Sequence, residues 1–278
     1  MDDIDLYFEL VDAIDLGNLS AVDRFIKYNY EYVSRIKDAK NLRGESFVYM
    51  AVVNNDYMMV ECLIDHGFDF ISLKECNGNS PLSRAILFGY INCAKVLLRN
   101  GANPNRSYRG GACPIHFAAN FIGGSVGLDM LKLLIKHGAC VNAIMETPKG
   151  NIYSPLEIVL SKNNINKCDA ACILLKAHAN PNQVFSKGAT AIHYAAIMNN
   201  VGFMRLLLNF KADINQKLTK GSHKGSTALY IASYHGSNTV IDFLLENGAD
   251  KYIRNCFDES AAEAYYRKGY KDLYKQLL

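Results

Sequence analysis

The sequence predicts an all-α fold in which about eight helix-turn-helix repeats follow one another along the chain. Three observations predict it: a Ser or Thr precedes a short alanine-rich segment, a leucine-rich segment follows after a turn, and that segment ends in a second turn, usually at glycine. Residues 190–215 (TAIHYAAIMNNVGFMRLLLNFKADIN) show this order in full. A regular internal repeat determines the whole fold, because each repeat packs only against its neighbours.

The opening hydroxyl residue sets the period of the repeat. It falls at Ser46, Ser80, Ser154, Thr190, Thr227 and Ser260, with Cys113 in its place in one repeat. Successive openings are 34, 33, 41, 36, 37 and 33 residues apart, so the basic period is near 33. The longer spacings indicate insertions, and insertions in repeat proteins fall in loops.

A further, less regular repeat fits before the first opening, with helical segments at Tyr7–Leu16 and Ser20–Lys27. The expected repeats then span approximately residues 4–40, 41–74, 75–107, 108–148, 149–184, 185–221, 222–254 and 255–278. We expect the first and last to act as polar caps. On this division the whole of 1–278 is one domain.

Local chemistry supports the same division. A Ser or Thr hydroxyl can accept from the free N–H groups of the first helix, and the prolines at 81, 114 and 155 suit the first helical position. Glycines at 67, 101, 138 and 248 fit the left-handed turn that ends the second helix. His178 and Lys211 occupy this glycine position in two repeats, where we expect a strained backbone and a soft joint.

Composition excludes several classes of function. The formal net charge is +3, and no basic stripe with stacking aromatics is present, so nucleic acid is not favoured as a partner. The eight cysteines form no C-x-x-C pair, so we expect no metal and no disulfide. The acidic N-terminus has no apolar signal segment, and no run of 18 apolar residues occurs, which predicts a cytoplasmic protein without a membrane span.

The openings Cys113-Pro-Ile-His116, Thr190-Ala-Ile-His193 and Thr227-Ala-Leu-Tyr230 resemble the Thr-Pro-Leu-His motif of the ankyrin repeat. The resemblance covers essentially the entire chain. It implies an ankyrin-repeat solenoid with β-hairpin-like finger loops, and a structural role for His116 and His193. It also implies a protein-binding module that is not an enzyme and holds no cofactor.

In the ankyrin family, partners usually meet the concave side, formed by the finger loops and the ends of the first helices. The resemblance places large apolar residues there, and we expect them to form a partner-binding groove: Leu87, Phe88, Phe121, Ile197, Met198 and Tyr234. Basic residues lie near the expected finger tips, at Arg43, Arg109, Lys187 and Lys224. Together they predict a protein partner with an acidic, partly apolar surface. The alternative is that the apolar residues pack against adjoining repeats.

The expected function is that of a scaffold, adaptor or sequestering inhibitor of a signalling protein, acting as a monomer. An alternative is the substrate-recruiting subunit of a ubiquitin ligase, although no further segment follows the last repeat here. An enzyme is a third hypothesis, which the lack of paired acids in the insertions disfavours. The richness in Asn, Lys, Ile and Tyr resembles stand-alone ankyrin chains of large DNA viruses, intracellular bacteria or AT-rich protists. Such an origin would place the protein in a host cytoplasm.

Overall fold

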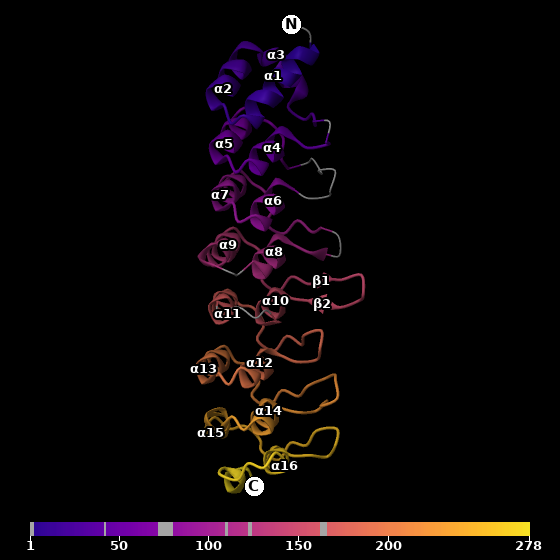
Figure 1. Cartoon of the computed structure of the whole chain (residues 1–278), viewed down its shortest axis with the longest axis vertical. Helices are drawn as coiled ribbons and strands as arrows, with labels where there is room; N and C mark the ends of the chain where they lie inside the picture. The colour runs from indigo at the N-terminus through magenta and orange to yellow at the C-terminus, as the bar shows by residue number, and fades with distance from the viewer. Residues whose placement is uncertain (1–2, 42, 72–79, 109–110, 122–123, 162–165) are drawn as a thin grey trace. The chain divides into compact units, whose positions relative to one another are not determined.

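The computed structural model describes residues 3–41, 43–71, 80–108, 111–121, 124–161 and 166–278. They form two compact units, Met1–Cys140 and Val141–Leu278, and each is a stack of paired helices (Figure 1). Below, these are called the N-terminal unit and the C-terminal unit. The expectation of a single domain, with the repeat boundaries given above, stays a prediction.

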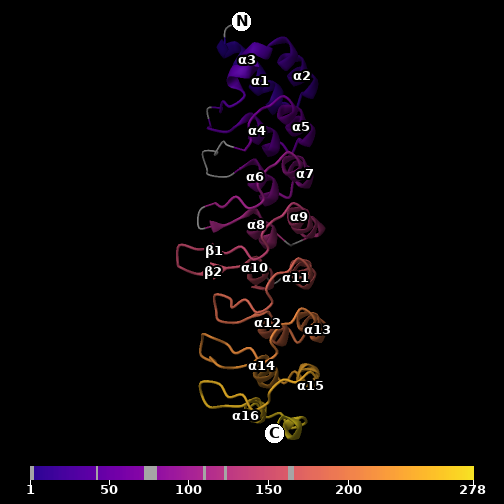
Figure 2. The ribbon, with the colours of Figure 1, turned by 180° about the vertical axis from the view of Figure 1, so that it is seen from behind.

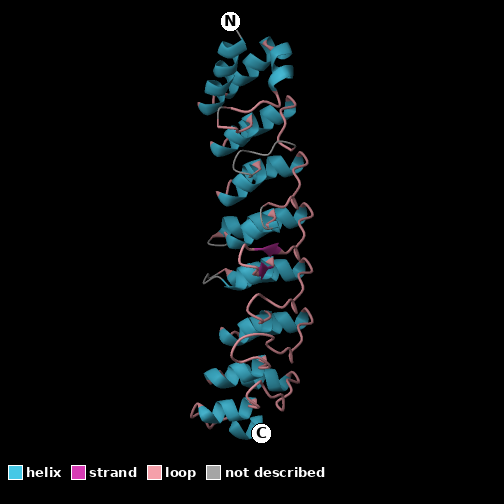
Figure 3. Ribbon diagram, turned by 90° about the vertical axis from the view of Figure 1, so that its right-hand side faces the viewer, coloured by secondary structure: helices cyan, strands magenta, loops and turns pink. Residues whose placement is uncertain are grey.

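The N-terminal unit contains, within its described residues, α1 (Asp3–Asp15), α2 (Leu19–Tyr28), α3 (Tyr30–Ile36), α4 (Phe47–Val53), α5 (Tyr57–Asp65), α6 (Pro81–Leu87), α7 (Ile91–Arg99), α8 (Pro114–Asn120) and α9 (Ser125–Lys136). The C-terminal unit contains β1 (Met145–Glu146), β2 (Ile152–Tyr153), α10 (Pro155–Ser161), α11 (Lys167–Lys176), α12 (Ala191–Ile197), α13 (Val201–Asn209), α14 (Ala228–His235), α15 (Asn238–Glu246), α16 (Ala261–Arg267) and α17 (Tyr274–Leu277). The all-α prediction is therefore confirmed, with one two-stranded sheet among the described residues (Figure 3).

The predicted caps begin the first helix of each pair. The Ser46 hydroxyl accepts from the Tyr49 N–H at 3.2 Å, and Ser80 and Ser83 satisfy each other's backbone N–H groups. Ser260 does the same with Glu263. A hydroxyl or carboxylate at these positions accepts hydrogen bonds from N–H groups at the helix start. In a helix of only seven residues these groups would otherwise have no partner.

The alanines of the first helices allow neighbouring repeats to pack closely. Ala51, Ala85 and Ala118 are fully buried, and α4 packs on α6 and α6 on α8. In the C-terminal unit α12 packs on α14 and α14 on α16 in the same way, with Ala195 and Ala232 at the contact. The second helices line the other side of each stack, as Figure 2 shows from behind.

Within each unit, the described loops that precede first helices project to one side, opposite the second helices (Figure 1). One of them is the β1–β2 hairpin, in which Met145 pairs with Tyr153 and Glu146 with Ile152. Other loops close on a few backbone hydrogen bonds, such as Phe185 N–H to Ala189 O at 2.7 Å and Leu218 N–H to Ser226 O at 2.9 Å. These are the hairpin-like fingers expected from the sequence.

Asparagine side chains link several repeats to the next one. Asn142 donates to the His178 carbonyl at 3.0 Å and accepts from the Asn180 N–H at 2.9 Å. Asn182 donates to the Lys211 carbonyl at 3.1 Å and accepts from the Asp213 N–H at 2.8 Å. Equivalent contacts join Asn105 to Gly138 and Cys140, and Asn215 to Asp250. This set is called the asparagine ladder below.

The ladder meets the turns that end the second helices. As expected, His178 and Lys211 have left-handed backbones, with φ of 68° and 63°. Gly138 and Gly248 in the equivalent turns have φ of 83° and 86°. A side chain at these angles is strained, so the asparagine of the preceding repeat holds a turn that the residue itself disfavours.

The first and last repeats depart from the rest. The first contains three helices rather than the two expected, because Tyr30–Ile36 continues as α3 beyond a break at Asn29. The last ends in the four-residue α17, whose Leu277 is buried. Within α16, Tyr265 replaces the usual alanine and donates its hydroxyl to Asn238 Oδ1 at 2.9 Å.

Candidate functional site

The histidines of the opening motifs are structural. His116 Nδ1 accepts from the Cys113 N–H at 3.0 Å, and His193 Nδ1 accepts from the Thr190 N–H at 3.1 Å. Both rings are buried. Burial lowers the pKa of His193 to about 4, so its ring is neutral at pH 7.

One Cys–His pair has a spacing that could be mistaken for a catalytic one. Cys62 Sγ lies 3.8 Å from His66 Nδ1, but the same nitrogen lies 2.8 Å from the Cys62 carbonyl. Burial, followed by the charges of Asp23 and Asp65, raises the pKa of the Cys62 thiol. A nucleophilic cysteine needs a lowered thiol pKa, so the raised pKa of Cys62 disfavours a catalytic role for this pair.

In the N-terminal unit, Leu87 ends α6, Phe88 follows it, and Phe121 follows α8. Their exposed fractions are 38%, 49% and 44%, large for apolar side chains. A Cβ added at Gly89 would lie 3.1 Å from the Phe121 ring, so Phe121 packs directly on the turn that carries Phe88. The structure thus brings the three predicted residues into one patch, called the Phe88 patch.

Two further side chains complete the Phe88 patch. The Tyr90 ring stacks on the Phe88 ring with centroids 5.8 Å apart, and the Arg84 guanidinium lies 3.7 Å from the centre of that ring. The Arg84 Nε is buried and has no hydrogen-bond partner among the described residues. The Arg84 guanidinium places a positive charge next to the apolar Phe88 ring. A partner that presents an apolar side chain beside an acidic one would match both groups.

In the C-terminal unit the predicted apolar residues differ in accessibility. Ile197, the last residue of α12, is 57% exposed, whereas Met198 and Tyr234 are half-buried. The Lys268 ammonium lies 3.9 Å from the centre of the Tyr234 ring, and the His223 ring lies 5.6 Å away. Tyr234 is therefore partly covered by its own chain, and its contact with Lys268 lowers the pKa of the phenol.

The basic residues predicted near the finger tips are exposed where the structure describes them. These are Arg43, Lys187 and Lys224, and Arg109 lies outside the described residues. Arg43 borders a hollow of about 430 Å³ that Phe8, Met50 and Val53 also line. The tips precede the first helix and the apolar residues follow it, so the helix, about 10 Å long, lies between the two groups within a repeat. His223, which reaches Tyr234 from its finger, joins them.

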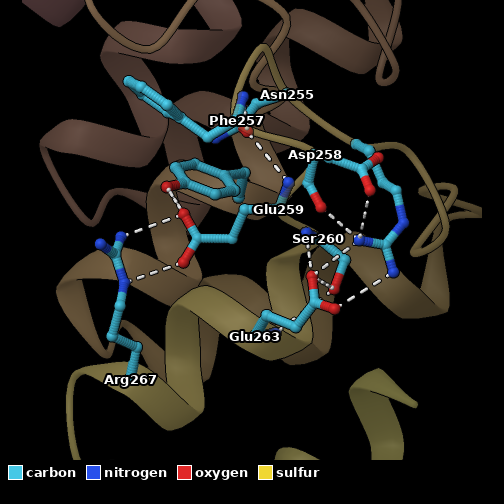
Figure 4. A network of polar contacts seen from close by, with 9 residues as sticks. Asn255, Phe257, Asp258, Glu259, Ser260, Glu263 and Arg267 are labelled. Atoms are coloured by element: carbon cyan, nitrogen blue, oxygen red, sulfur yellow. Dashed lines mark hydrogen bonds and ion pairs between the residues drawn. The ribbon is translucent and has the colours of Figure 1, made fainter.

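Sequence reasoning missed a cluster on the last two repeats, shown in Figure 4. The Glu259 carboxylate accepts from the Tyr230 hydroxyl at 2.6 Å and pairs with Arg267 at 2.8 Å. Beside it Phe257 is 63% exposed and lies 5.9 Å from the His223 ring, centroid to centroid. A hollow of about 540 Å³ is lined by His223, Phe257, Asp258, Glu259, Glu263 and Arg267.

Two apolar residues on the β1–β2 finger were also missed. Ile144 and Ile152 are 52% and 49% exposed. Their signal in the sequence is the turn Pro148-Lys149-Gly150-Asn151 between two short apolar pairs, which is typical of a short hairpin. No such signal marks the Phe257 finger in the sequence. Its turn has a left-handed residue, but that residue is Asp258, with φ of 57°, and not a glycine.

Comparison with protein families decides the identity of this fold. The family model for ankyrin repeats (three copies) matches residues 10–108 and 156–255, and the single ankyrin repeat matches 110–146. This chain belongs to the ankyrin repeat family. Ankyrin repeats mediate protein–protein interaction, and the fold is generally a binding module without enzymatic activity.

Curated ankyrin relatives are distant and much longer. The chain is 25% identical over 88% of its length to the E3 ubiquitin-protein ligase KEG of Arabidopsis thaliana. It is 24% identical over 88% to an ankyrin repeat protein of Acanthamoeba polyphaga mimivirus, and 24% identical over 80% to human NF-kappa-B inhibitor zeta. It spans only 15%, 30% and 30% of the lengths of these three proteins.

Solved ankyrin structures share the fold. An ankyrin repeat domain from Acinetobacter baumannii matches with a TM-score of 0.63 and 23% identity, covering 74% of this chain and all of that one. The human ASB11 ankyrin repeat domain matches with a TM-score of 0.58 and 24% identity, covering 83% and 95%. Among the described helices of this chain, none is long and apolar enough to cross a membrane.

Proposed function

We propose that this ankyrin repeat chain works by occupying a signalling protein in the cytoplasm, as a scaffold, adaptor or sequestering inhibitor. The observation that carries the proposal is the Phe88 patch, where Leu87, Phe88 and Phe121 are each more than a third exposed and lie together. Apolar surface of this kind is stabilised when a partner covers it, by about 25 cal/mol per Å² removed from water. The name of human NF-kappa-B inhibitor zeta supports an inhibitory role by similarity alone.

The partner's surface is proposed to be acidic and partly apolar. Ile197 offers a second apolar contact, with Met198 and Tyr234 beside it at half exposure. Exposed Lys187 and Lys224 would steer an acidic partner and raise its association rate in a salt-dependent manner. Tyr234 contributes less apolar area than the sequence predicts, because Lys268 covers one face of its ring.

The experiment begins with affinity capture of partners on the full chain, followed by mass spectrometry. The binding of a captured partner is then compared among the parent, Phe88→Ala, Tyr234→Ala and the control Lys95→Ala, which alters an exposed residue of the second helix α7. Truncation of an interface anchor costs about 2 kcal/mol, or roughly thirtyfold in affinity. We expect that loss for Phe88→Ala, a smaller loss for Tyr234→Ala and none for Lys95→Ala. Equal affinity of all four correctly folded proteins would contradict the proposal.

A second candidate is the recruitment of substrates to a ubiquitin ligase, which the similarity to KEG favours. The region shared with this chain is 15% of that protein, so the similarity does not extend to its whole activity. Capture experiments separate the two candidates. A recruiting subunit brings ligase components along with the substrate, whereas a sequestering protein is recovered with its partner alone.

A further inference from the structure

The fingers of the C-terminal unit are tied directly to one another. The Thr219 N–H donates to the Gly188 carbonyl at 3.0 Å, which joins the finger of α12 to that of α14. The Cys256 N–H donates to the Lys224 carbonyl at 2.8 Å, which joins the finger of α14 to that of α16. A Cβ added at Gly188 would lie 2.4 Å from the Lys220 backbone nitrogen, so the first two fingers are in close backbone contact.

A buried carboxylate fixes the first of these fingers from below. Glu157 is 3% exposed, and its Oε1 accepts from the Ser186 N–H at 2.9 Å and from the Ser186 hydroxyl. The Lys220 ammonium donates to the Ser186 carbonyl at 3.4 Å from the other side. The fingers are therefore held in place before any partner arrives, which reduces the entropy lost on binding.

The tips of these tied fingers carry positive charge. Residues 185–226 contain six Lys or Arg and one acid, Asp213. Lys187, Lys217 and Lys224 are exposed, and within the described residues their ammonium groups make no hydrogen bond or ion pair. Unpaired cations on a rigid surface attract an anionic partner.

Exposed apolar residues lie on the fingers at both ends of this row of fingers. The β1–β2 finger, at the start of the row, presents Ile144 and Ile152, and the finger of α16, at its end, presents Phe257. Within this unit the fingers follow one another in chain order along one side (Figure 1). The β1–β2 finger also carries the exposed Lys149 in its closing turn. Three basic fingers therefore precede an aromatic one, and the first of the three has apolar residues along its strands.

We propose that this row of fingers binds an extended, acidic peptide segment of the partner, with apolar residues on both sides of its acidic run. The inference rests on the proposed function, and it adds the face and the kind of sequence that this face reads. Packed helices lie about 10 Å apart, so four successive tips span about 30 Å. An extended segment of roughly nine residues covers that distance at about 3.3 Å per residue.

Protein fits this row better than nucleic acid. Single-stranded nucleic acid binds where cations alternate with aromatic faces on which bases can stack. The apolar residues of the β1–β2 finger are aliphatic, and the aromatic tip at the other end, Phe257, lies next to Asp258 and Glu259, whose carboxylates repel phosphates. Apolar residues at the two ends of a peptide need no ring to stack on and carry no charge that these carboxylates would repel.

The test pans a display library of random 12-residue peptides against the full chain. Two charge-reversed variants are panned in parallel: Lys187→Glu/Lys224→Glu at the finger tips, and Lys95→Glu/Lys176→Glu on the second helices as a matched control. All four lysines are exposed and make no side-chain hydrogen bond or ion pair within the described residues, and circular dichroism checks that both variants fold like the parent.

We expect enriched peptides with a central acidic run and apolar residues at both ends. Measured by fluorescence anisotropy, their affinity should fall at least tenfold on the finger variant and stay unchanged on the control. Ile152→Ser and Phe257→Ser should each weaken binding severalfold and remove the preference for apolar ends. Enrichment without acidic residues, or equal binding to the finger variant, would overturn the inference. So would a 12-nucleotide single-stranded DNA or RNA that binds more tightly than the best peptide.

These outcomes separate the inference from the proposed function. A captured partner that depends on Phe88 but ignores the finger reversals leaves the proposed function intact and overturns the inference. A partner that ignores Phe88 and loses affinity on the finger variant supports the inference and contradicts the choice of the Phe88 patch as anchor.

Discussion

Replacing Lys211 with glycine should stabilise the fold. Its backbone has φ of 63°, and its side chain is exposed and makes no hydrogen bond or ion pair among the described residues, so the substitution removes strain without removing a contact. Left-handed backbone costs a non-glycine residue about 1 kcal/mol or more, and part of the gain is offset by the greater freedom of glycine in the unfolded chain. We expect a net gain of up to about 1 kcal/mol. In a chain of this length that raises Tm by about 2–4 °C.

The mirror substitution supplies the control. Gly248 has φ of 86° in the equivalent turn, and an added Cβ would meet nothing within 4 Å. Gly248→Lys should therefore cost about 1 kcal/mol through its backbone alone. Both variants keep the carbonyl to which the asparagine ladder donates at residue 211, since that group belongs to the main chain. Guanidinium and thermal unfolding followed by circular dichroism measure the two shifts.

The reasoning is refuted if Lys211→Gly unfolds at the same denaturant concentration as the parent, or earlier, while Gly248→Lys unfolds earlier. In that case residue 211 would tolerate its left-handed backbone without strain. Two changes of equal size and opposite sign would instead show that φ alone sets the cost at this turn.

Three further predictions concern the rest of the chain. Amide exchange should show residues 149–221 opening before the described parts of 41–107, because His178 and Lys211 weaken the first segment; uniform protection would contradict this. His193 should make the fold acid-sensitive, because its pKa is about 4 in the folded state and 6.5 in the unfolded state. Its contribution to the free energy of unfolding is complete above pH 6.5 and is lost as the pH falls toward 4. The loss is on the order of 3 kcal/mol, and a flat stability profile over that range would contradict it. Reductant and chelator should leave Tm unchanged, and Cys93, whose thiol pKa burial raises to about 11, should react with iodoacetamide only on unfolding; a drop of several degrees or rapid labelling of the native protein would be the contrary results.

Much of the fold could be predicted because its signals are local. A hydroxyl that caps a helix and a glycine that ends one act within a few residues, so their spacing gives the helix pairs directly. Even the exceptions followed: Lys211 occupies a glycine position and has the positive φ that this position requires. The helix α3 was missed, since nothing before Asn29 or after it marks a third helix in a repeat that normally has two.

The candidate site was less predictable because exposure depends on residues far away in the chain. Tyr234 occupies the same repeat position as the exposed Leu87, yet Lys268 of the next repeat lies over its ring. The exposure of Phe257 depends on how its finger lies against His223 of the preceding finger, and no local sequence pattern gives that. The contact of Thr219 with Gly188 joins two stretches of main chain, so apart from the glycine that its close approach requires, it leaves no pattern in the sequence.

The asparagine ladder also marks where the chain can gain or lose a repeat. Asn182 and Asn215 make the same contact with the following turn, so a cut after each removes one complete period. Deleting residues 183–215 would join Asn182 to Gln216. The Asn182 side-chain oxygen would then accept the hydrogen bond from the Asp250 N–H, which Asn215 accepts in the parent chain. Duplication between the same two seams would lengthen the array in register. The number of fingers offered to a partner is therefore a quantity that unequal recombination can change by one without disturbing the remaining turns.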